Sequence, residues 1–269
     1  HCHHRMAVFY AKFFHGKAKI IYNNHTIYSD KPYFTHFVLK NILIVADGIQ
    51  AKNNVTNFFK ISEKNVKVIY NAVDPFDGIK SEIKEIQDRR EKGDFIVLDS
   101  SRLHPQKGIN YFIDAAKILV DKGYKISFFI VGDGVLHDKV VNQIKDLELQ
   151  NNIILLGFRK DIKNVISQAD ILVLTSIYEG LPLTPMEAFS VKRAAIGTNI
   201  EGTREVIEDG INGLLAETKN PQDIAEKIER VYLDRKLLNK LSENAYKTYK
   251  NKFSDELFIK KYVDLYEAL

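Results

Sequence analysis

Residues 171–197, ILVLTSIYEGLPLTPMEAFSVKRAAIG, decide the fold of this protein. The continuous apolar run at 171–174 predicts a buried strand, residues 185–191 predict a helix, and residues 194–197 predict the next strand. Strands that are apolar on both faces are typical of a parallel sheet covered by helices on both sides.

The same alternation runs through the residues before this stretch. The further predicted strands are 95–98, 126–131 and 153–156, and the predicted helices are 109–120, 136–147 and 162–168. Together they predict a doubly wound α/β domain. In such a sheet the ligand lies outside the carboxyl ends of the strands, so we expect the chemistry in the loops that follow them.

The first third of the chain has an α/β pattern of its own. It predicts short strands at 20–23, 42–46 and 66–70 and helices at 5–15 and 53–60. Asp-Pro, Asp-Gly and a charged run then interrupt the apolar pattern. The predicted organisation is an N-terminal domain at 1–74, a linker at 75–93, a C-terminal domain at 94–250, and a terminal helix at 251–269 that packs back toward the N-terminal domain. A helical excursion within a single domain is the alternative to the linker.

Composition is that of a soluble globular protein, with 45% hydrophobic and 28% charged residues among 269. The sequence contains no apolar run of 18 residues and shows no signal-peptide pattern at its start. Cys2 is the single cysteine, which fits a reducing compartment. We therefore expect a cytoplasmic protein.

Positive charge is concentrated in the first third. Residues 1–74 hold ten Lys/Arg and four Asp/Glu, whereas the remaining residues hold 29 and 31. Aromatic residues are interleaved with these cations, which would suit peripheral contact with an anionic membrane or a phosphorylated acceptor. A solvated basic face over an aromatic core is the alternative, and composition alone favours it. Nucleic acid is not expected as a partner, because no recognition motif accompanies the charge.

The loop at 100–108, SSRLHPQKG, follows the first strand of the C-terminal domain. Arg102 and Lys107 place a guanidinium fork and an ammonium five residues apart, which suits the oxygens of a diphosphate. The N–H groups of the following helix would add further donors. The alternative is a solvated turn, since Pro and Gly mark turns in any case.

Two further strand ends carry weaker signals. Gly132 and Gly134 would let a ligand approach the backbone closely, although a tight turn is the more common reason for such a pair. The third glycine of the dinucleotide fingerprint is missing, which disfavours a nicotinamide-dependent oxidoreductase. Phe158 and Arg159 would flank a nucleobase, and a core position for Phe158 is an equal alternative.

The loop at 176–188, SIYEGLPLTPMEA, enters a helix. We predict Thr184 as its N-cap and Pro185 as its first residue, and such a helix start suits a phosphate. Glu187 falls in the predicted first turn, where it would accept hydrogen bonds from a ribose diol, and Glu179 would face another hydroxyl-bearing group. The alternative is that Glu187 only stabilises the helix dipole and Glu179 is solvated.

Glu179 and Glu187, with seven intervening residues, resemble the paired-glutamate motif of retaining GT-B glycosyltransferases, specifically glycosyltransferase family 4 (glycosyl transferases group 1). Other family motifs are matched in order at 101–108, 131–134, 156–158, 169–171 and 209–215, and residues 68–74 resemble the end of the family's acceptor domain. The resemblance covers essentially the whole chain. It implies an α/β fold of the GT-B type, with a doubly wound parallel-sheet donor domain and a partial Rossmann-like acceptor domain.

The resemblance also implies a role for each matching residue. Arg102 and Lys107 would neutralise the donor diphosphate and the charge on the departing nucleotide. Glu187 would bind the ribose hydroxyls, and Glu179 the hydroxyls of the donor sugar. The remaining donor contacts would come from Gly132, Phe158, Arg159, Gly180, Leu181, Leu183 and Thr184.

His1-Cys2-His3 resembles the family's His-x-His strand end, in which the second histidine, here His3, approaches the donor sugar. A metal site at the N-terminal histidines is a competing interpretation, but no carboxylates that would support it are nearby in the sequence. The resemblance implies a reaction that retains anomeric configuration without a protein nucleophile, a metal or another cofactor, because positioning and the two loop cations supply the catalysis.

The implied substrates are a nucleotide-sugar donor, with UDP favoured, and a saccharide or polyprenyl-linked acceptor in the synthesis of a cell-surface polysaccharide such as a capsule. A transferase of this kind would work peripherally on the inner face of the membrane. In the family, the acceptor domain opens with a glycine-rich loop, and here that domain starts about halfway through. If residues 1–269 are the entire polypeptide, we expect donor binding to survive better than transfer, and the alternative function is a binding-only remnant that holds the nucleotide-sugar.

Overall fold

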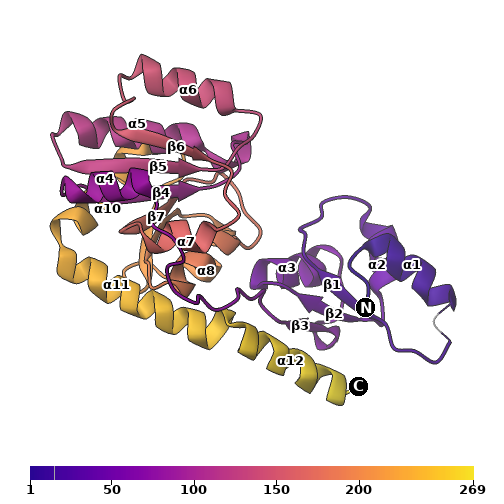
Figure 1. Cartoon of the computed structure of the whole chain (residues 1–269). Helices are drawn as coiled ribbons and strands as arrows, with labels where there is room; N and C mark the ends of the chain where they lie inside the picture. Colours follow the sequence, from indigo (N-terminus) through magenta and orange to yellow (C-terminus); the bar gives the residue numbers. More distant parts are fainter. Residues whose placement is uncertain (15) are drawn as a thin grey trace. The chain divides into compact units, whose positions relative to one another are not determined.

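The computed structural model describes residues 1–14 and 16–269, and the chain divides into two compact units. Unit 1 is formed by His1–Ala72 together with Lys252–Leu269, and unit 2 by Val73–Asn251. Each unit contains a parallel sheet with helices around it (Figure 1). Residue 15, which the sequence analysis placed at the end of a helix, lies outside the described residues.

Unit 2 contains a six-stranded parallel sheet in the order β6-β5-β4-β7-β8-β9. The strands are β4 (Phe95–Ser100), β5 (Ile126–Val131), β6 (Ile153–Gly157), β7 (Ile171–Leu174), β8 (Ala195–Thr198) and β9 (Gly213–Ala216). The chain moves outward from β4 through β5 to β6, and then returns to the other side of β4 with β7. The direction of winding therefore reverses between β4 and β7, and this is where such sheets bind ligands.

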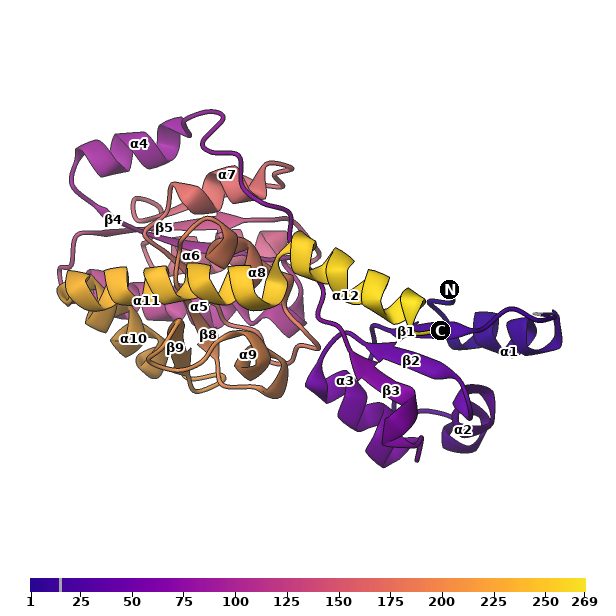
Figure 2. The ribbon, with the colours of Figure 1, turned by 90° about the horizontal axis from the view of Figure 1, so that it is seen from below.

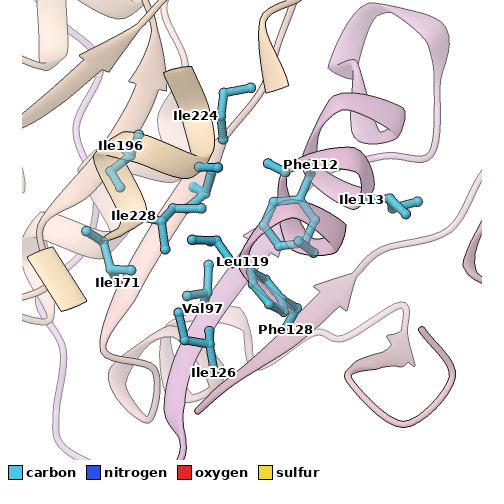
Figure 3. Close-up of a cluster of buried hydrophobic side chains, with 14 of the residues drawn as sticks. Val97, Phe112, Ile113, Leu119, Ile126, Phe128, Ile171, Ile196, Ile224 and Ile228 are labelled. Carbon is cyan, nitrogen blue, oxygen red and sulfur yellow. The ribbon is translucent and has the colours of Figure 1, made fainter. Parts of the chain in front are cut away.

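Helices cover both faces of this sheet. They are α4 (Lys84–Glu91), α5 (Ile109–Asp121), α6 (His137–Asp146), α7 (Ile162–Ser167), α8 (Leu183–Ser190), α9 (Glu201–Val206), α10 (Pro221–Leu233) and α11 (Arg235–Thr248). Helices α5 and α10 pack together on one face, where Phe112 and Phe128 meet edge to face (Figure 3). Helix α8 lies on the opposite face, against β7 and β8 (Figure 1). Burial on both faces explains why these strands are continuous apolar runs.

Residues 75–93 pack on unit 2, whereas the sequence analysis expected a linker there. The backbone N–H groups of Lys80 and Ile83 donate to the side chains of Asn164 and Gln168, at 3.1 and 2.9 Å. Helix α4 buries Ile86 and turns its charged residues outward. The charged run is therefore the solvent-facing side of a surface helix rather than an extended connection.

Unit 1 contains the parallel strands β1 (Ile21–Asn24), β2 (Leu43–Ala46) and β3 (Val66–Val68), in that order. Its helices are α1 (Arg5–Phe14), α2 (Pro32–Leu39), α3 (Ile49–Asn53) and α12 (Asp255–Glu267). One face of the sheet joins Tyr22 and Ile44 to the first three helices. The other face packs Ile21 and Val45 against Leu265 of α12, and Figure 2 shows α12 on the side of the sheet away from α2 and α3.

Four short helical segments connect these elements. Asn54–Phe58 and Tyr249–Phe253 are π-helical, and Glu63–Asn65 and Pro105–Lys107 are 3-10 turns. The helix predicted at 53–60 is thus replaced by α3 followed by a π-helical turn. Within the described ranges, no helix combines the length and the apolar character that are needed to cross a bilayer.

Candidate functional site

Two loops meet where the winding of the unit 2 sheet reverses: the β4 loop (residues 101–108) and the β7 loop (residues 175–182). The Ile177 N–H donates to the Gln106 carbonyl at 2.8 Å, and the Gln106 amide donates to the Tyr178 carbonyl at 3.0 Å. The Thr175 hydroxyl donates to the carbonyl oxygens of Lys107 and Gly108, both at 3.1 Å. These bonds fix the two loops as one rigid surface.

Gly108 makes this close approach possible. It has a φ of +61°, and a Cβ at this position would lie 2.4 Å from the carbonyl oxygen of Thr175. Any other residue would both strain the backbone and push the β7 loop away. Gly108, which is the N-cap residue of α5, therefore also sets the spacing between the two loops.

The two loops bring a cation and a carboxylate into contact. Lys107 Nζ lies 2.5 Å from Glu179 Oε1, and the Ser176 hydroxyl donates to the same oxygen at 2.6 Å. The side chains of Lys107 and Glu179 are only 16% and 9% exposed. The structure thus joins two residues that the sequence analysis had placed on separate loops with separate targets. It adds Ser176, which that analysis missed because a serine in a loop carries no pattern of its own.

Arg102 precedes Lys107 on the same β4 loop, and its side chain is exposed. Among the described residues, its guanidinium has no hydrogen-bond or ion-pair partner. A ligand can therefore use all of its donors. An unpaired guanidinium on the same loop as a paired lysine presents positive charge outward, as the binding of a diphosphate requires.

Gly132 and Gly134 have a structural explanation in the β4 loop. A Cβ on Gly132 would lie 1.9 Å from the Ser101 carbonyl oxygen, and one on Gly134 would lie 2.5 Å from the Leu103 carbonyl oxygen. The Leu103 N–H also donates to the Asp133 carbonyl at 3.0 Å. These glycines let the residues after β5 press against the β4 loop, so the close approach that they permit is to protein backbone.

Helix α8 begins earlier than the sequence analysis predicted. Its N-cap is Pro182, with φ −72° and ψ 125°, and Leu183 is the first helical residue, so the prediction of Thr184 as N-cap was wrong. Pro185 still falls in the first turn, where its missing N–H costs no intrahelical bond. Glu187 consequently lies beyond the first turn, where it is too far along the helix for the dipole role that was its alternative.

Glu187 is partly buried, and burial raises the pKa of its carboxyl, while the charge of Lys163 acts in the opposite direction. In the described part of the chain, its carboxylate has no hydrogen-bond or ion-pair partner. A sheltered carboxylate with unused acceptors is suited to a ligand that offers two hydroxyl groups.

The other predicted donor contacts differ in how exposed they are and in whether another side chain holds them. Phe158 is 71% exposed, which rules out the core position that was its alternative, and Arg159 forms a bidentate pair with Asp161 at 2.9 and 2.7 Å. Gly180 and Leu183 are exposed, and Leu181 and Thr184 are half-buried. A Cβ on Gly180 would meet no atom within 4 Å.

Gly202, at the start of α9, is a residue that the sequence analysis did not assign to the site. A Cβ there would lie 2.1 Å from the Gly180 carbonyl oxygen and 2.6 Å from that of Glu179. Thr198 supports the same loop, because its hydroxyl donates to the Ser176 carbonyl at 2.5 Å. The β7 loop is therefore held from β4, β8 and α9 together.

His3 belongs to unit 1 and not to the unit that carries these loops. Its Nδ1 lies 3.0 Å from His25 Nε2, and the imidazole of His25 lies 3.8 Å from the Asp47 carboxylate. Cys2 pairs with Tyr22 as an isolated parallel bridge, so His3 follows a strand-like residue at the edge of β1. Across residues 1–14 and 16–269, no three His, Cys, Asp or Glu side chains gather in a way that could hold a metal ion.

Comparison with known proteins gives the family. The family of glycosyl transferases group 1 matches residues 80–248. The UDP-Gal:alpha-D-GlcNAc-diphosphoundecaprenol alpha-1,3-galactosyltransferase of Escherichia coli is 33% identical over 190 residues, which are 70% of this chain and 49% of that protein. The poly(ribitol-phosphate) alpha-N-acetylglucosaminyltransferase of Staphylococcus aureus is 32% identical over 174 residues, or 64% and 35% of the two chains. The chain spans about half the length of the curated relatives it matches.

Solved structures give the fold. A glycosyltransferase from Rickettsia africae has a TM-score of 0.84 at 27% identity, covering 97% of this chain and 73% of its own. Anabaena Alr3699/HepE in complex with UDP-glucose has a TM-score of 0.83 at 22% identity, covering 99% and 77%. The expected α/β fold of the GT-B type is confirmed by these likenesses.

Proposed function

This chain belongs to the glycosyl transferases group 1, and we propose that it transfers a hexose from a nucleotide diphosphate sugar to a saccharide or lipid-linked acceptor. The observation that carries the proposal is the contact between Lys107 and Glu179, which joins the two loops at the reversal of the sheet. A cation for phosphate and a carboxylate for hydroxyl groups lie there side by side. A sugar diphosphate carries its phosphate and its hydroxyl groups close together, because the phosphate is attached to the sugar ring itself.

Four side chains divide the donor between them. Arg102 and Lys107 bind the diphosphate, and Glu179 binds hydroxyl groups of the sugar. Glu187 binds the ribose diol through carboxylate acceptors that none of the described residues uses. Phe158, which is exposed, lies beside the base, while Arg159 is fixed by Asp161 and orders that loop.

Transfer proceeds with retention and without a metal or a protein nucleophile. The acceptor oxygen forms a bond to the anomeric carbon, and the bond from that carbon to the diphosphate oxygen breaks, with its electron pair going to the phosphate. The leaving phosphate takes the proton of the acceptor hydroxyl. Arg102 and Lys107 stabilise the negative charge that develops there, and preorganised cations of this kind lower a barrier by several kcal/mol (about 3 for one donor).

UDP is the favoured nucleotide. The name of the E. coli relative specifies UDP-Gal, and the Anabaena structure of similar fold holds UDP-glucose. A lipid-linked acceptor is supported by relatives in E. coli and Campylobacter jejuni whose names specify diphospho-undecaprenol substrates. These features favour a role in cell-surface polysaccharide synthesis.

Isothermal titration calorimetry with UDP and GDP, followed by an assay of UDP-hexose consumption, tests this function. We expect UDP to bind and Glu187→Ala to weaken it by about tenfold or more, since the ribose would lose two charge-assisted hydrogen bonds. Glu243→Ala removes an exposed glutamate of α11 and serves as the matched control. If neither nucleotide binds, the proposed function is wrong, and binding without donor consumption would restrict it to a nucleotide-sugar-binding role.

Unit 1 carries features that suit an anionic membrane surface. Phe13, Phe14 and Tyr33 are 64%, 83% and 89% exposed. In the same unit, a cavity of about 670 Å³ is lined by Lys12, Lys17, Lys19 and Lys40, at the amino ends of β1 and β2. Cations near exposed aromatics contribute about 1 kcal/mol each at such a surface.

Vesicle sedimentation tests this contact. We expect the chain to sediment with phosphatidylglycerol vesicles and not with phosphatidylcholine vesicles. Replacing Lys17, Lys19 and Lys40 by Glu is expected to abolish sedimentation. The control replaces the exposed unit 2 residues Lys139, Lys145 and Lys240 by Glu, which changes the net charge equally. Equal loss in both triple variants would show only a dependence on net charge and would overturn the assignment to unit 1.

A further inference from the structure

Asp99 is a fully buried carboxylate next to the β4 loop, and the donor chemistry described above does not use it. It lies near the carboxyl end of β4, with no exposed surface, opposite the apolar residue Ile130 of β5. The Ser101 hydroxyl donates to Oδ1 at 2.6 Å. The other carboxylate oxygen, Oδ2, is buried and has no hydrogen-bond partner among the described residues.

Lys107 is a positive charge that acts on the Asp99 carboxyl. Burial is the main influence on the Asp99 carboxyl and raises its pKa to about 7, while the Ser101 hydrogen bond and the charge of Lys107 act to lower it. Lys107 already contacts Glu179 at 2.5 Å. The Lys107 ammonium thus contacts the Glu179 carboxylate directly and acts through its charge on the Asp99 carboxyl.

A diphosphate that reaches Lys107 adds at least two negative charges to this arrangement. The ammonium then offsets the phosphate, and its stabilisation of an ionised Asp99 is weakened. A buried carboxylate with an unpartnered oxygen cannot find compensation in water, so the protonated form becomes favoured.

We propose that Asp99 is a positioning residue of the donor site, which takes up a proton when a nucleoside diphosphate engages Lys107. The proton comes from solvent or buffer and forms an O–H bond on the Asp99 carboxylate, with no other bond changed. Protonation removes the negative charge of Asp99, so the Lys107 ammonium interacts more strongly with the phosphate. This inference rests on the proposed function, because it requires the diphosphate to bind at the β4 loop.

Titration calorimetry of the full chain with UDP, in buffers of different ionisation enthalpy, measures the protons taken up on binding. The wild type is expected to take up a fraction of a proton near pH 7.5, and Asp99→Asn is expected to lack that fraction. UDP affinity of the wild type should fall as pH rises above about 7, by up to tenfold for each unit by which binding raises the pKa, and the affinity of Asp99→Asn should vary less. The titration of the UDP phosphate itself is common to both proteins.

Two further variants separate this role from a structural one. Asp114→Asn is the matched control, because burial also raises the pKa of Asp114, which accepts a hydrogen bond from Gln143 of α6 rather than from the β4 loop. It should leave the proton uptake unchanged. Ser101→Ala removes a hydrogen bond that favours the ionised form, so the maximum of proton uptake should move to higher pH, which keeps the inference testable if Asp99→Asn does not fold.

UDP binding with equal proton uptake in wild type and Asp99→Asn would overturn the inference and leave the proposed function standing. The same holds if the maximum of uptake in Ser101→Ala stays where it is in the wild type. If neither UDP nor GDP binds, the proposed function and the inference fall together.

Discussion

Lys107 of the β4 loop and Glu179 of the β7 loop form a 2.5 Å ion pair, which the donor of the proposed function would have to share or break. Both side chains are largely buried, so the pair is screened little by water. In the chain without a ligand, the Glu179 carboxylate is therefore paired with the Lys107 ammonium, the group that would bind the diphosphate in the proposed function.

Glu179→Gln should weaken the binding of UDP-sugar relative to that of UDP. Without the carboxylate, Lys107 is freed for phosphate, so UDP should bind as tightly as before or more tightly. UDP-glucose should lose its advantage over UDP, and turnover should fall by about a hundredfold, since an oriented charge is lost from the site. Calorimetry with both ligands measures this. Asp121→Asn, which breaks the exposed pair with Lys117, is the control, and weaker UDP binding in Glu179→Gln would contradict the prediction.

Gly202→Ala should lower both stability and donor affinity. The added methyl group would overlap the Gly180 carbonyl oxygen, so either the β7 loop or α9 must move, which costs about 1–3 kcal/mol of unfolding free energy. Chemical denaturation and UDP-glucose titration measure the two effects. Gly180→Ala is the matched control for the stability measurement, because its methyl group would meet no atom within 4 Å. Equal stability of the two variants would show that α9 does not support the loop.

Asp99→Asn should stabilise the chain in alkaline solution. The folded pKa of about 7 is raised above the ordinary value of 3.8, so the folded state holds its proton more tightly than the unfolded state. The stability this confers is complete below about pH 4 and is lost as pH rises through about 7. The variant keeps the neutral form at all pH values, and its advantage at pH 8 should approach about 4 kcal/mol as an upper bound. Denaturation at pH 5 and pH 8 tests this, and an advantage that does not grow with pH would contradict it.

UDP binding should weaken in acid through Glu187. Burial raises the pKa of this carboxyl, and its protonated form has lost one acceptor for the ribose diol. Affinity should therefore fall as pH is lowered through the raised pKa, which is the opposite direction to the effect of Asp99. Titrations of UDP into wild type and Glu187→Gln from about pH 5 upward distinguish them. A wild-type profile as flat as that of the variant in acid would argue against ribose binding by Glu187.

The sequence predicted the sheet and the site loops because both depend on short local patterns. Apolar runs of four to six residues located β4, β5, β6, β7 and β8, although not β9. The rule that ligands lie outside the carboxyl ends of the strands then placed Arg102, Lys107 and Glu179 at one edge of the sheet. The family resemblance supplied the expectation of two domains of the GT-B type. These parts of the interpretation needed no knowledge of which loops touch.

The remaining parts depend on contacts between distant segments. Gly202 matters because α9 lies close against the β7 loop, and Asp99 matters because its second carboxylate oxygen is buried without a hydrogen-bond partner among the described residues. Neither fact has a sequence pattern. The start of α8 was misplaced for a local reason, since Thr184 is helical although a residue before proline usually is not.

Unit 1 is assembled from two stretches of chain that are synthesised far apart in time. Its sheet is made before residue 73, but Leu265, which covers one face of that sheet, emerges only after all of unit 2. During synthesis, Ile21 and Val45 therefore stay exposed to solvent until α12 has been made. Unit 2 is a continuous stretch of chain and can fold before that. The sheet of unit 1 is therefore covered on this face only after α12 has been synthesised, and a chain cut within α12 before Leu265 would leave that apolar face open.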